Sequence, residues 1–225
     1  MCKTQIDQII RTKRKTFAII IQSDGRLVVR APLRATNRQI IAFVDQHAGW
    51  IQQKQAEVSS RNMKSQAKNF RDGEKFLFLG KEYPLILVDN QKQPLLLDGS
   101  FKLAARVQPK AQLAFTGWYK KQAAEIIFAR VDSYVNQHGF SFTKFGITGA
   151  RTRWGSCSQK GSLNFSWRLV MAPMEIIDYI VVHELVHTRH HNHSRDFWSA
   201  VAQIMPQYRQ RRSWLKENGY LLTRD

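Results

Sequence analysis

Two histidines and a glutamate, at a spacing that suits a metal ion, stand out in the sequence. Residues 183–187 read His-Glu-Leu-Val-His, so His183 and His187 are four residues apart. On a helix this spacing places both side chains on one face, about 6 Å apart along the axis, where both imidazoles can reach one ion. Glu184 projects to the neighbouring side, where it can serve as general base toward a metal-bound water. The pattern is typical of a zinc hydrolase.

The segment before this motif supports a metal site over an accidental pattern on a solvated helix. Residues 176–182 are apolar apart from Asp178 and Tyr179, which is too apolar for a surface helix. Imidazoles and a carboxylate carried on from a buried segment need partners, because unpaired buried polar groups cost several kcal/mol. A metal ion would supply that partner.

A zinc hydrolase needs a third protein ligand, and three histidines follow the motif. His190 could share the helix face of His187, but three ligands on one straight helix give poor tetrahedral geometry. His193 stands six residues after His187, the separation used in the longer zinc-protease motif, and Asn192 can end the helix before it. We therefore favour His193 as the third ligand and expect His190 and His191 to be solvated or to support the ligands from outside.

Five other residues near the motif have both a chemical and a structural interpretation. Cys157 could be a fourth ligand, although a buried structural thiol is commoner. Asp178 and Asp196 could each orient a ligand imidazole, or serve as capping or surface acids. Tyr179 and Tyr208 are possible hydrogen-bond donors to a transition state.

The elements that must position these residues follow from hydrophobic spacing and from turn and cap residues. We expect a hairpin over 17–29 with its turn at 23–25, and a helix over 37–51 that Thr36 or Asn37 caps. Residues 52–68 read as a frayed helix end and a linker. Further strands are expected at 75–79, 83–88, 95–97, 101–104 and within 143–169, and further helices at 113–137 (ended by Gly139), 173–185, 194–205 and 208–217. Strands and helices mix without regular alternation, which predicts an α+β fold.

Composition limits the class of protein. Of 225 residues, 43% are hydrophobic and 23% charged, the balance of a folded globular chain. Two cysteines, Cys2 and Cys157, exclude a disulfide scaffold and favour a reducing compartment. No apolar run approaches the roughly 20 residues of a membrane span, and the start lacks an apolar leader. We expect a cytoplasmic protein without membrane association.

The chain is strongly basic, with 35 Lys and Arg against 17 Asp and Glu, a formal charge of +18. Such an excess favours polyanions, either nucleic acid or small molecules that carry phosphate. The alternative for each basic cluster is a solvated surface without a dedicated partner. One cluster lies within residues 11–15, and the other on the expected last helix comprises Arg209, Arg211, Arg212 and Lys216.

Together these residues resemble the YgjP-like metallopeptidase family, which is related to the SprT-like zinc proteases. The resemblance spans nearly the whole chain, is densest from 153 to 198 and is loose between 55 and 110. It implies a zincin-like α+β core with the active-site helix packed on a small sheet, Zn²⁺ on His183, His187 and His193, and Glu184 as catalytic residue. We accordingly divide the chain into a hairpin and helix region, 1–110, packed on a catalytic region, 111–225. The resemblance is carried by residues 153–157, Asn164, Leu169, 172–173, 178–187, 192–194 and 197–198.

The function favoured by motif and resemblance is a zinc metallopeptidase that cleaves peptides or proteins, with Glu184 assisting attack by a zinc-bound water. Two alternatives stay open. Nucleotide pyrophosphatase activity on UTP has been associated with YgjP-like proteins, and Arg151, Arg153 or Arg189 would then contact phosphates. The chain could instead bind nucleic acid around a structural zinc, closed by Cys157 as fourth ligand.

Overall fold

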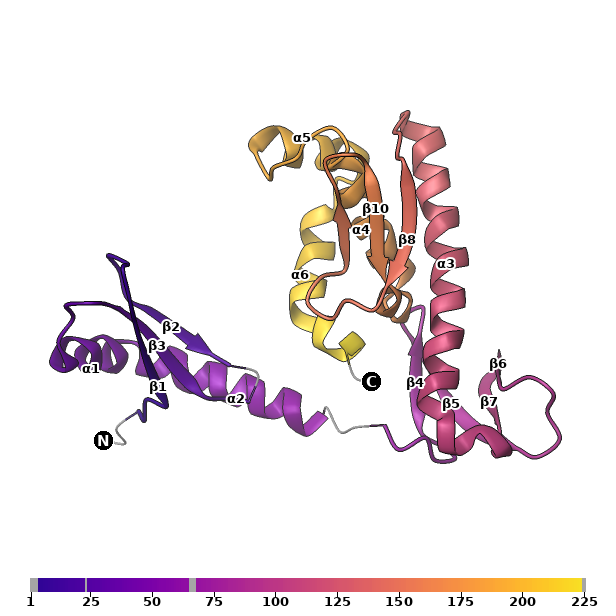
Figure 1. The fold of residues 1–225 in the computed structure, drawn as a ribbon, viewed down its shortest axis with the longest axis horizontal. Coiled ribbons are helices and arrows are strands. Elements are labelled where there is room, and N and C mark those ends of the chain that lie inside the picture. Colours follow the sequence, from indigo (N-terminus) through magenta and orange to yellow (C-terminus); the bar gives the residue numbers. More distant parts are fainter. Residues whose placement is uncertain (1–3, 23, 65–67, 224–225) are drawn as a thin grey trace. The chain divides into compact units, whose positions relative to one another are not determined.

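The computed structural model describes residues 4–22, 24–64 and 68–223 (Figure 1). The chain divides into two compact units, Met1–Gln66 and Ala67–Asp225. This boundary differs from our division at residue 110. The strands between 75 and 104 fall within the second unit because Phe76, Leu85 and Phe101 join the same hydrophobic core as Phe115.

The described residues of the first unit form a three-stranded sheet and two helices. Strands β2 and β3 form the predicted antiparallel hairpin, although Ser23 of its turn lies outside the described residues. Strand β1 pairs parallel with β3, which we did not predict. Thr36 caps α1 as predicted, in a capping box with Gln39. The single helix that we expected over 37–51 is instead two helices, since α1 ends at His47, and α2 continues well beyond 51. The bounds are β1 Gln8–Thr12, β2 Ala18–Ile21, β3 Leu27–Pro32, α1 Asn37–Gln46 and α2 Ala48–Lys64; residues 65–67 of the predicted linker lie outside the described part.

The part of the second unit that the structure describes contains two sheets, and their strands lie where the sequence predicts them. The first sheet has the order β4-β5-β7-β6, and the second the order β8-β10-β9. In the second sheet β8 is parallel to β10, whereas β9 is antiparallel to it and forms an edge. The bounds are β4 Lys75–Phe78, β5 Lys81–Val88, β6 Leu95–Asp98, β7 Ser100–Ala104, β8 Lys144–Thr148, β9 Gly155–Cys157 and β10 Ser162–Ser166.

Four α-helices accompany these sheets in the described residues of the second unit. The long helix α3 runs beside β8 (Figure 1) and ends at Gly139, whose left-handed backbone, with φ of 65°, suits glycine. Ser194 caps α5 through its side chain, as the sequence predicts. The bounds are α3 Ala111–His138, α4 Met174–Val186, α5 Arg195–Ile204 and α6 Tyr208–Asn218, with short 3₁₀ helices at Ala105–Lys110, Trp167–Met171 and Gly219–Thr223.

Helix α4 lies at the centre of the second unit. It contacts α3, α5, α6 and strand β9, and side chains such as Ile177, Val181 and Leu185 are fully buried. A helix buried on all sides holds its residues more rigidly than a loop does. The predicted α+β class is confirmed by this mixture of small sheets and helices. None of the helices in the described residues is both long and apolar enough to cross a membrane.

Candidate metal centre

The three predicted ligands come from one helix end and the turn that follows it. His183 lies in the last turn of α4, and His187 is the residue at which that helix ends. The chain then turns and re-enters a helix at Ser194, whose N–H donates to the side chain of Asn192 (3.2 Å). This turn returns His193 toward α4. The helix ends at His187 and not at Asn192 as we expected, and the side chain of Asn192 instead accepts a hydrogen bond at the start of α5.

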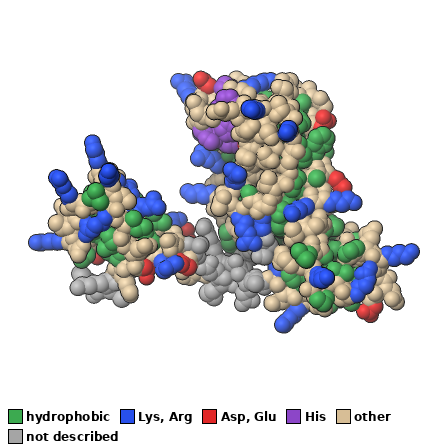
Figure 2. Space-filling view, viewed as in Figure 1, with side chains coloured by type: hydrophobic (Ala, Val, Ile, Leu, Met, Phe, Trp, Pro, Cys, Tyr) green, Lys and Arg blue, Asp and Glu red, His purple; other side chains and the backbone are tan. Residues whose placement is uncertain are grey.

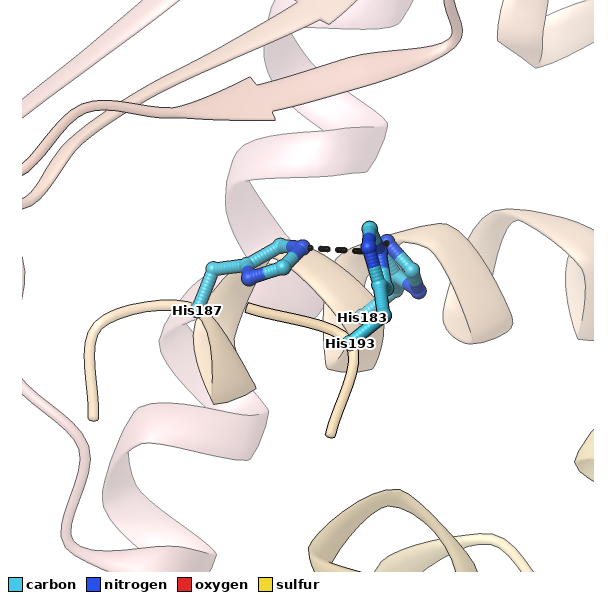
Figure 3. A group of neighbouring side chains, drawn as sticks. All are labelled: His183, His187 and His193. Atoms are coloured by element: carbon cyan, nitrogen blue, oxygen red, sulfur yellow. Dashed lines mark hydrogen bonds between the residues drawn. The ribbon is translucent and has the colours of Figure 1, made fainter. Parts of the chain in front are cut away.

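Three imidazole nitrogens converge on one point (Figure 3). Nε2 of His193 lies 3.1 Å from Nε2 of His183 and 3.2 Å from Nε2 of His187. Nitrogens bound tetrahedrally to zinc at 2.0 to 2.1 Å would be about 3.3 Å apart. Two of the three pairs have about this separation, and all three ligand atoms lie within 4.8 Å of one another, so the donor set fits a metal ion such as zinc. Among the described residues no further His, Cys, Asp or Glu joins this group.

The ring of His187 is oriented by a backbone carbonyl. Its Nδ1 lies 2.9 Å from the carbonyl oxygen of His190. A carbonyl only accepts, so Nδ1–H donates and Nε2 keeps its lone pair toward the centre, the tautomer that binds metals. His190 thus supports the centre through its backbone rather than as a ligand, while His191 is exposed.

The ring of His183 is held by packing. Nδ1 of His183 is buried and has no hydrogen-bond partner among the described residues. Tyr179 and Phe197 pack edge-on against this ring, at 6.0 and 5.0 Å between centroids. Burial, followed by the neighbouring His187 and His193, lowers the pKa of His183 to about 3. The ring therefore stays neutral, which is the form a metal needs.

Glu184 is almost completely buried, with 5% of its surface exposed. Burial raises its pKa to about 7, and the positive charge of Arg153 opposes that rise. A carboxyl group that titrates near neutrality can both accept and return a proton under physiological conditions. Glu184 therefore has the electrostatic properties expected of a general base.

Strand β9 makes room for this carboxyl group at Gly155. A Cβ atom on Gly155 would lie 2.5 Å from Oε1 of Glu184 and 2.6 Å from its Cγ. No ordinary side chain could therefore stand here without displacing Glu184 or the strand. We did not predict this contact from the sequence. A glycine inside a short strand is the signal that marks such a close approach.

The buried carboxyl group makes the stability of the metal-free protein depend on pH. The pKa of Glu184 is about 4.5 when exposed and about 7 in the folded chain, so between these values the folded state binds more protons than the unfolded state. Stability contributed by this group is therefore lost as the pH rises from about 4.5 to 7. We expect wild type to lose about 3 kcal/mol relative to Glu184→Gln between pH 4.5 and 8.

Urea denaturation of both proteins in the presence of a chelator would measure this difference. The effect of His183 protonation on the free energy of unfolding occurs in both proteins and cancels in the difference between them. A stability difference that does not change with pH would show that Glu184 is not desolvated.

Cys157 lies outside the group of imidazoles. It is half-buried, and its Sγ donates to the carbonyl of Ser158. Burial and the negative charge of Glu184 raise the pKa of its thiol. The structure thus favours a structural thiol over a fourth ligand.

The two nearby acids do not orient the imidazoles. Asp178 accepts two hydrogen bonds from Arg130, at 2.6 and 3.0 Å, and so joins α4 to α3. Asp196 is exposed in the first turn of α5, where a negative charge complements the helix dipole. For both residues the structural interpretation is the one that the structure supports.

Tyr179 and Tyr208, which we considered as hydrogen-bond donors to a transition state, make different contacts in the structure. The Tyr179 side chain is buried and packs on His183. The Tyr208 hydroxyl accepts from Nε of Arg209 at 3.3 Å, and its ring is also buried.

Two aromatic residues of α5 complete the centre and were not recognised as part of it from their chemistry. Phe197 is fully buried, and its ring centroid lies 4.5 to 5.0 Å from the centroids of all three imidazole rings. The Trp198 ring stacks on His193, at 5.6 Å between centroids. Their position directly after a helix cap that follows a ligand is the signal available in the sequence.

In this mixed domain, the central helix and the turn after it bring three imidazoles together, and the same helix carries a buried glutamate. This is the donor set of a metal-binding protein. Comparison with known families matches residues 15–218 to the YgjP-like metallopeptidase domain. The chain therefore belongs to the YgjP-like metallopeptidase family, and the resemblance stated from its sequence is confirmed. No curated protein matches the chain.

Proposed function

We propose that the chain is a zinc-dependent peptidase with a zincin-like catalytic core. The observation that carries this proposal is the convergence of three imidazoles, with Nε2 of His193 at 3.1 and 3.2 Å from those of His183 and His187. Two of these residues lie at the end of the helix that also carries the buried Glu184. Membership of a metallopeptidase family and the possible metal site support a metal-dependent hydrolase. Its partner would be a peptide or protein substrate.

His183, His187 and His193 would hold the zinc ion. When bound, zinc supplies Lewis acidity that polarises a carbonyl and makes a water molecule more acidic. Glu184, whose carboxyl group is buried on the same helix, takes the proton of the attacking water and can return it to the leaving amine. Phe197 fixes the three rings by packing, and the carbonyl of His190 fixes the tautomer of His187.

The alternative of a structural zinc in a nucleic-acid-binding protein has less support. Structural zinc sites are closed by four protein ligands. Within the described residues the group has three imidazoles, and Cys157 is not among them. The excess of positive charge is equally compatible with an enzyme that acts on acidic substrates.

The alternative of a nucleotide pyrophosphatase also lacks a specific observation. Arg189 donates to the carbonyl groups of His138 and Gly139 at the end of α3, at 3.2 and 2.6 Å, and so is used within the fold. The charge of Arg153 acts on Glu184. The nucleotide alternative is therefore kept as an outcome of the test rather than as a second proposal.

The test is to incubate zinc-loaded protein with a peptide library and with a panel of nucleoside triphosphates. We expect about one zinc per chain, hydrolysis within the peptide library, loss of hydrolysis on removing zinc with a chelator, and recovery when zinc is returned. The variant His193→Ala should lose both the metal and hydrolysis, whereas His191→Ala, which replaces an exposed histidine outside the group, should keep both. Consumption of nucleotides alone, or activity that persists without metal, would refute the proposal.

A further inference from the structure

A groove adjoins the candidate metal centre on the side of α6. Its volume is about 660 Å³, and Trp198 joins it to the centre, because the indole stacks both on His193 and on Tyr208, at 5.6 and 5.3 Å between centroids. A ligand in this groove would therefore lie one aromatic ring away from a metal ligand. The lining residues are Trp198, Tyr208, Arg209, Arg212, Ser213 and Lys216.

Three cations line the groove along one face of α6. Arg209, Arg212 and Lys216 are three and four residues apart, so they follow one another over about 10 Å of the helix. All three are exposed, and none of the described carboxylates forms an ion pair with them. The nearest acid in sequence, Glu217, accepts a hydrogen bond from Ser213 at 2.8 Å.

Trp198 connects this row of cations to the metal centre. The Arg212 guanidinium lies over the Trp198 ring, 4.9 Å from its centroid, and the same ring stacks on His193. Figure 2 shows a patch of histidine side chains on the second unit, with Lys and Arg side chains close by. The groove is therefore suited to an anionic part of whatever ligand the centre acts on.

The shape of the row favours an acidic peptide over a nucleotide. Side chains on one face of an extended peptide recur about every 6.6 Å, so alternate acidic residues can follow cations spread over about 10 Å. A base that stacks on an aromatic ring would find little free surface here, because Trp198 already stacks on two rings and lies under Arg212, and Tyr208 is buried.

We propose that Arg209, Arg212 and Lys216 form a specificity groove that binds acidic side chains of a peptide on one side of the bond to be cleaved. This inference rests on the proposed peptidase function and adds the class of its substrate. Exposed ion pairs are individually weak, so the selectivity arises from several of them acting along the row.

The test compares two peptides that the zinc-loaded enzyme cleaves, identical except that the glutamates on one side of the cleaved bond are glutamines in the second. We expect kcat/KM to be about tenfold higher for the glutamate peptide at low salt and this preference to shrink with salt. The double variant Arg212→Gln, Lys216→Gln should reduce the preference to less than about threefold. The control Lys120→Gln, which removes an exposed charge of α3, should leave it unchanged.

Fluorescence anisotropy of both peptides with Glu184→Gln separates this inference from the proposed function. If wild type cleaves no peptide, the peptidase proposal fails. The binding measurement is then made with a peptide that contains alternate glutamates and its glutamine counterpart, and tighter binding of the glutamate peptide still supports the groove. Equal binding of both peptides would overturn the inference, as would an undiminished preference in the double variant. Nucleoside triphosphate that displaces neither peptide supports an acidic peptide as ligand, whereas preferential binding of the nucleotide would overturn it.

Discussion

Replacing Glu184 with glutamine is expected to lower kcat for peptide hydrolysis by a factor of about 10² to 10⁴, the usual contribution of a general base. Glutamine has nearly the same shape, so the buried space beside Gly155 stays filled. It cannot accept a proton from water, however, and the step that Glu184 would perform is lost. The metal should remain, because the three converging nitrogens belong to other residues.

Zinc content and steady-state kinetics of wild type and variant, measured on the same preparations, check this prediction. Asp178→Asn provides a matched control, because it also converts an acid of α4 into its amide, but at a position where the acid pairs with Arg130. That variant should lose stability and keep most of its activity. A Glu184→Gln protein with full zinc and undiminished kcat would exclude Glu184 as the base.

Local signals in the sequence predicted most elements of the fold. Cap residues such as Thr36, Gly139 and Ser194 start or end a helix through contacts with residues only a few positions away. The structure has a helix end at each of these three residues, as predicted. The parallel pairing of β1 with β3 and of β8 with β10 was not predictable in this way. Such pairing depends on residues distant in the chain, and a short strand such as β9 has too few residues to show a period.

In the metal centre, too, the parts set by local geometry were predictable and the contacts between elements were not. His183 and His187 are related by the fixed geometry of one helix, so their spacing alone predicts that their rings meet. The position of His193 depends on how the chain turns after the helix, and here the sequence supplied a preference that the structure's geometry agrees with. Contacts across elements, such as Phe197 on the three rings, have no local signature.

The contact of Gly155 with Glu184 is another of this kind. Replacing Gly155 with alanine is expected to cause the second large loss of catalytic rate. The added Cβ would overlap Oε1, Cγ and Cδ of Glu184, at 2.5, 2.6 and 2.8 Å, which is closer than real Cβ atoms approach. Overpacking of this kind costs about 1 to 3 kcal/mol, and the least costly relief is rotation of the Glu184 carboxyl group away from its place. Because a displacement of about 1 Å can cost 10²-fold in rate, we expect kcat to fall about a hundredfold while zinc is retained.

Thermal denaturation, zinc analysis and kinetics of Gly155→Ala would separate the loss of stability from the loss of rate. Gly117→Ala is the matched control, since it adds the same methyl group inside α3 with no atom within 4 Å. Alanine there should stabilise the helix by up to about 1 kcal/mol and leave kcat unchanged. If Gly155→Ala were as active as this control, the position of the Glu184 carboxyl group beside β9 would not matter for hydrolysis. A hundredfold loss with zinc bound would instead show that strand β9 positions the glutamate, and that the two parts of the motif region, 153–157 and 183–187, work as one unit.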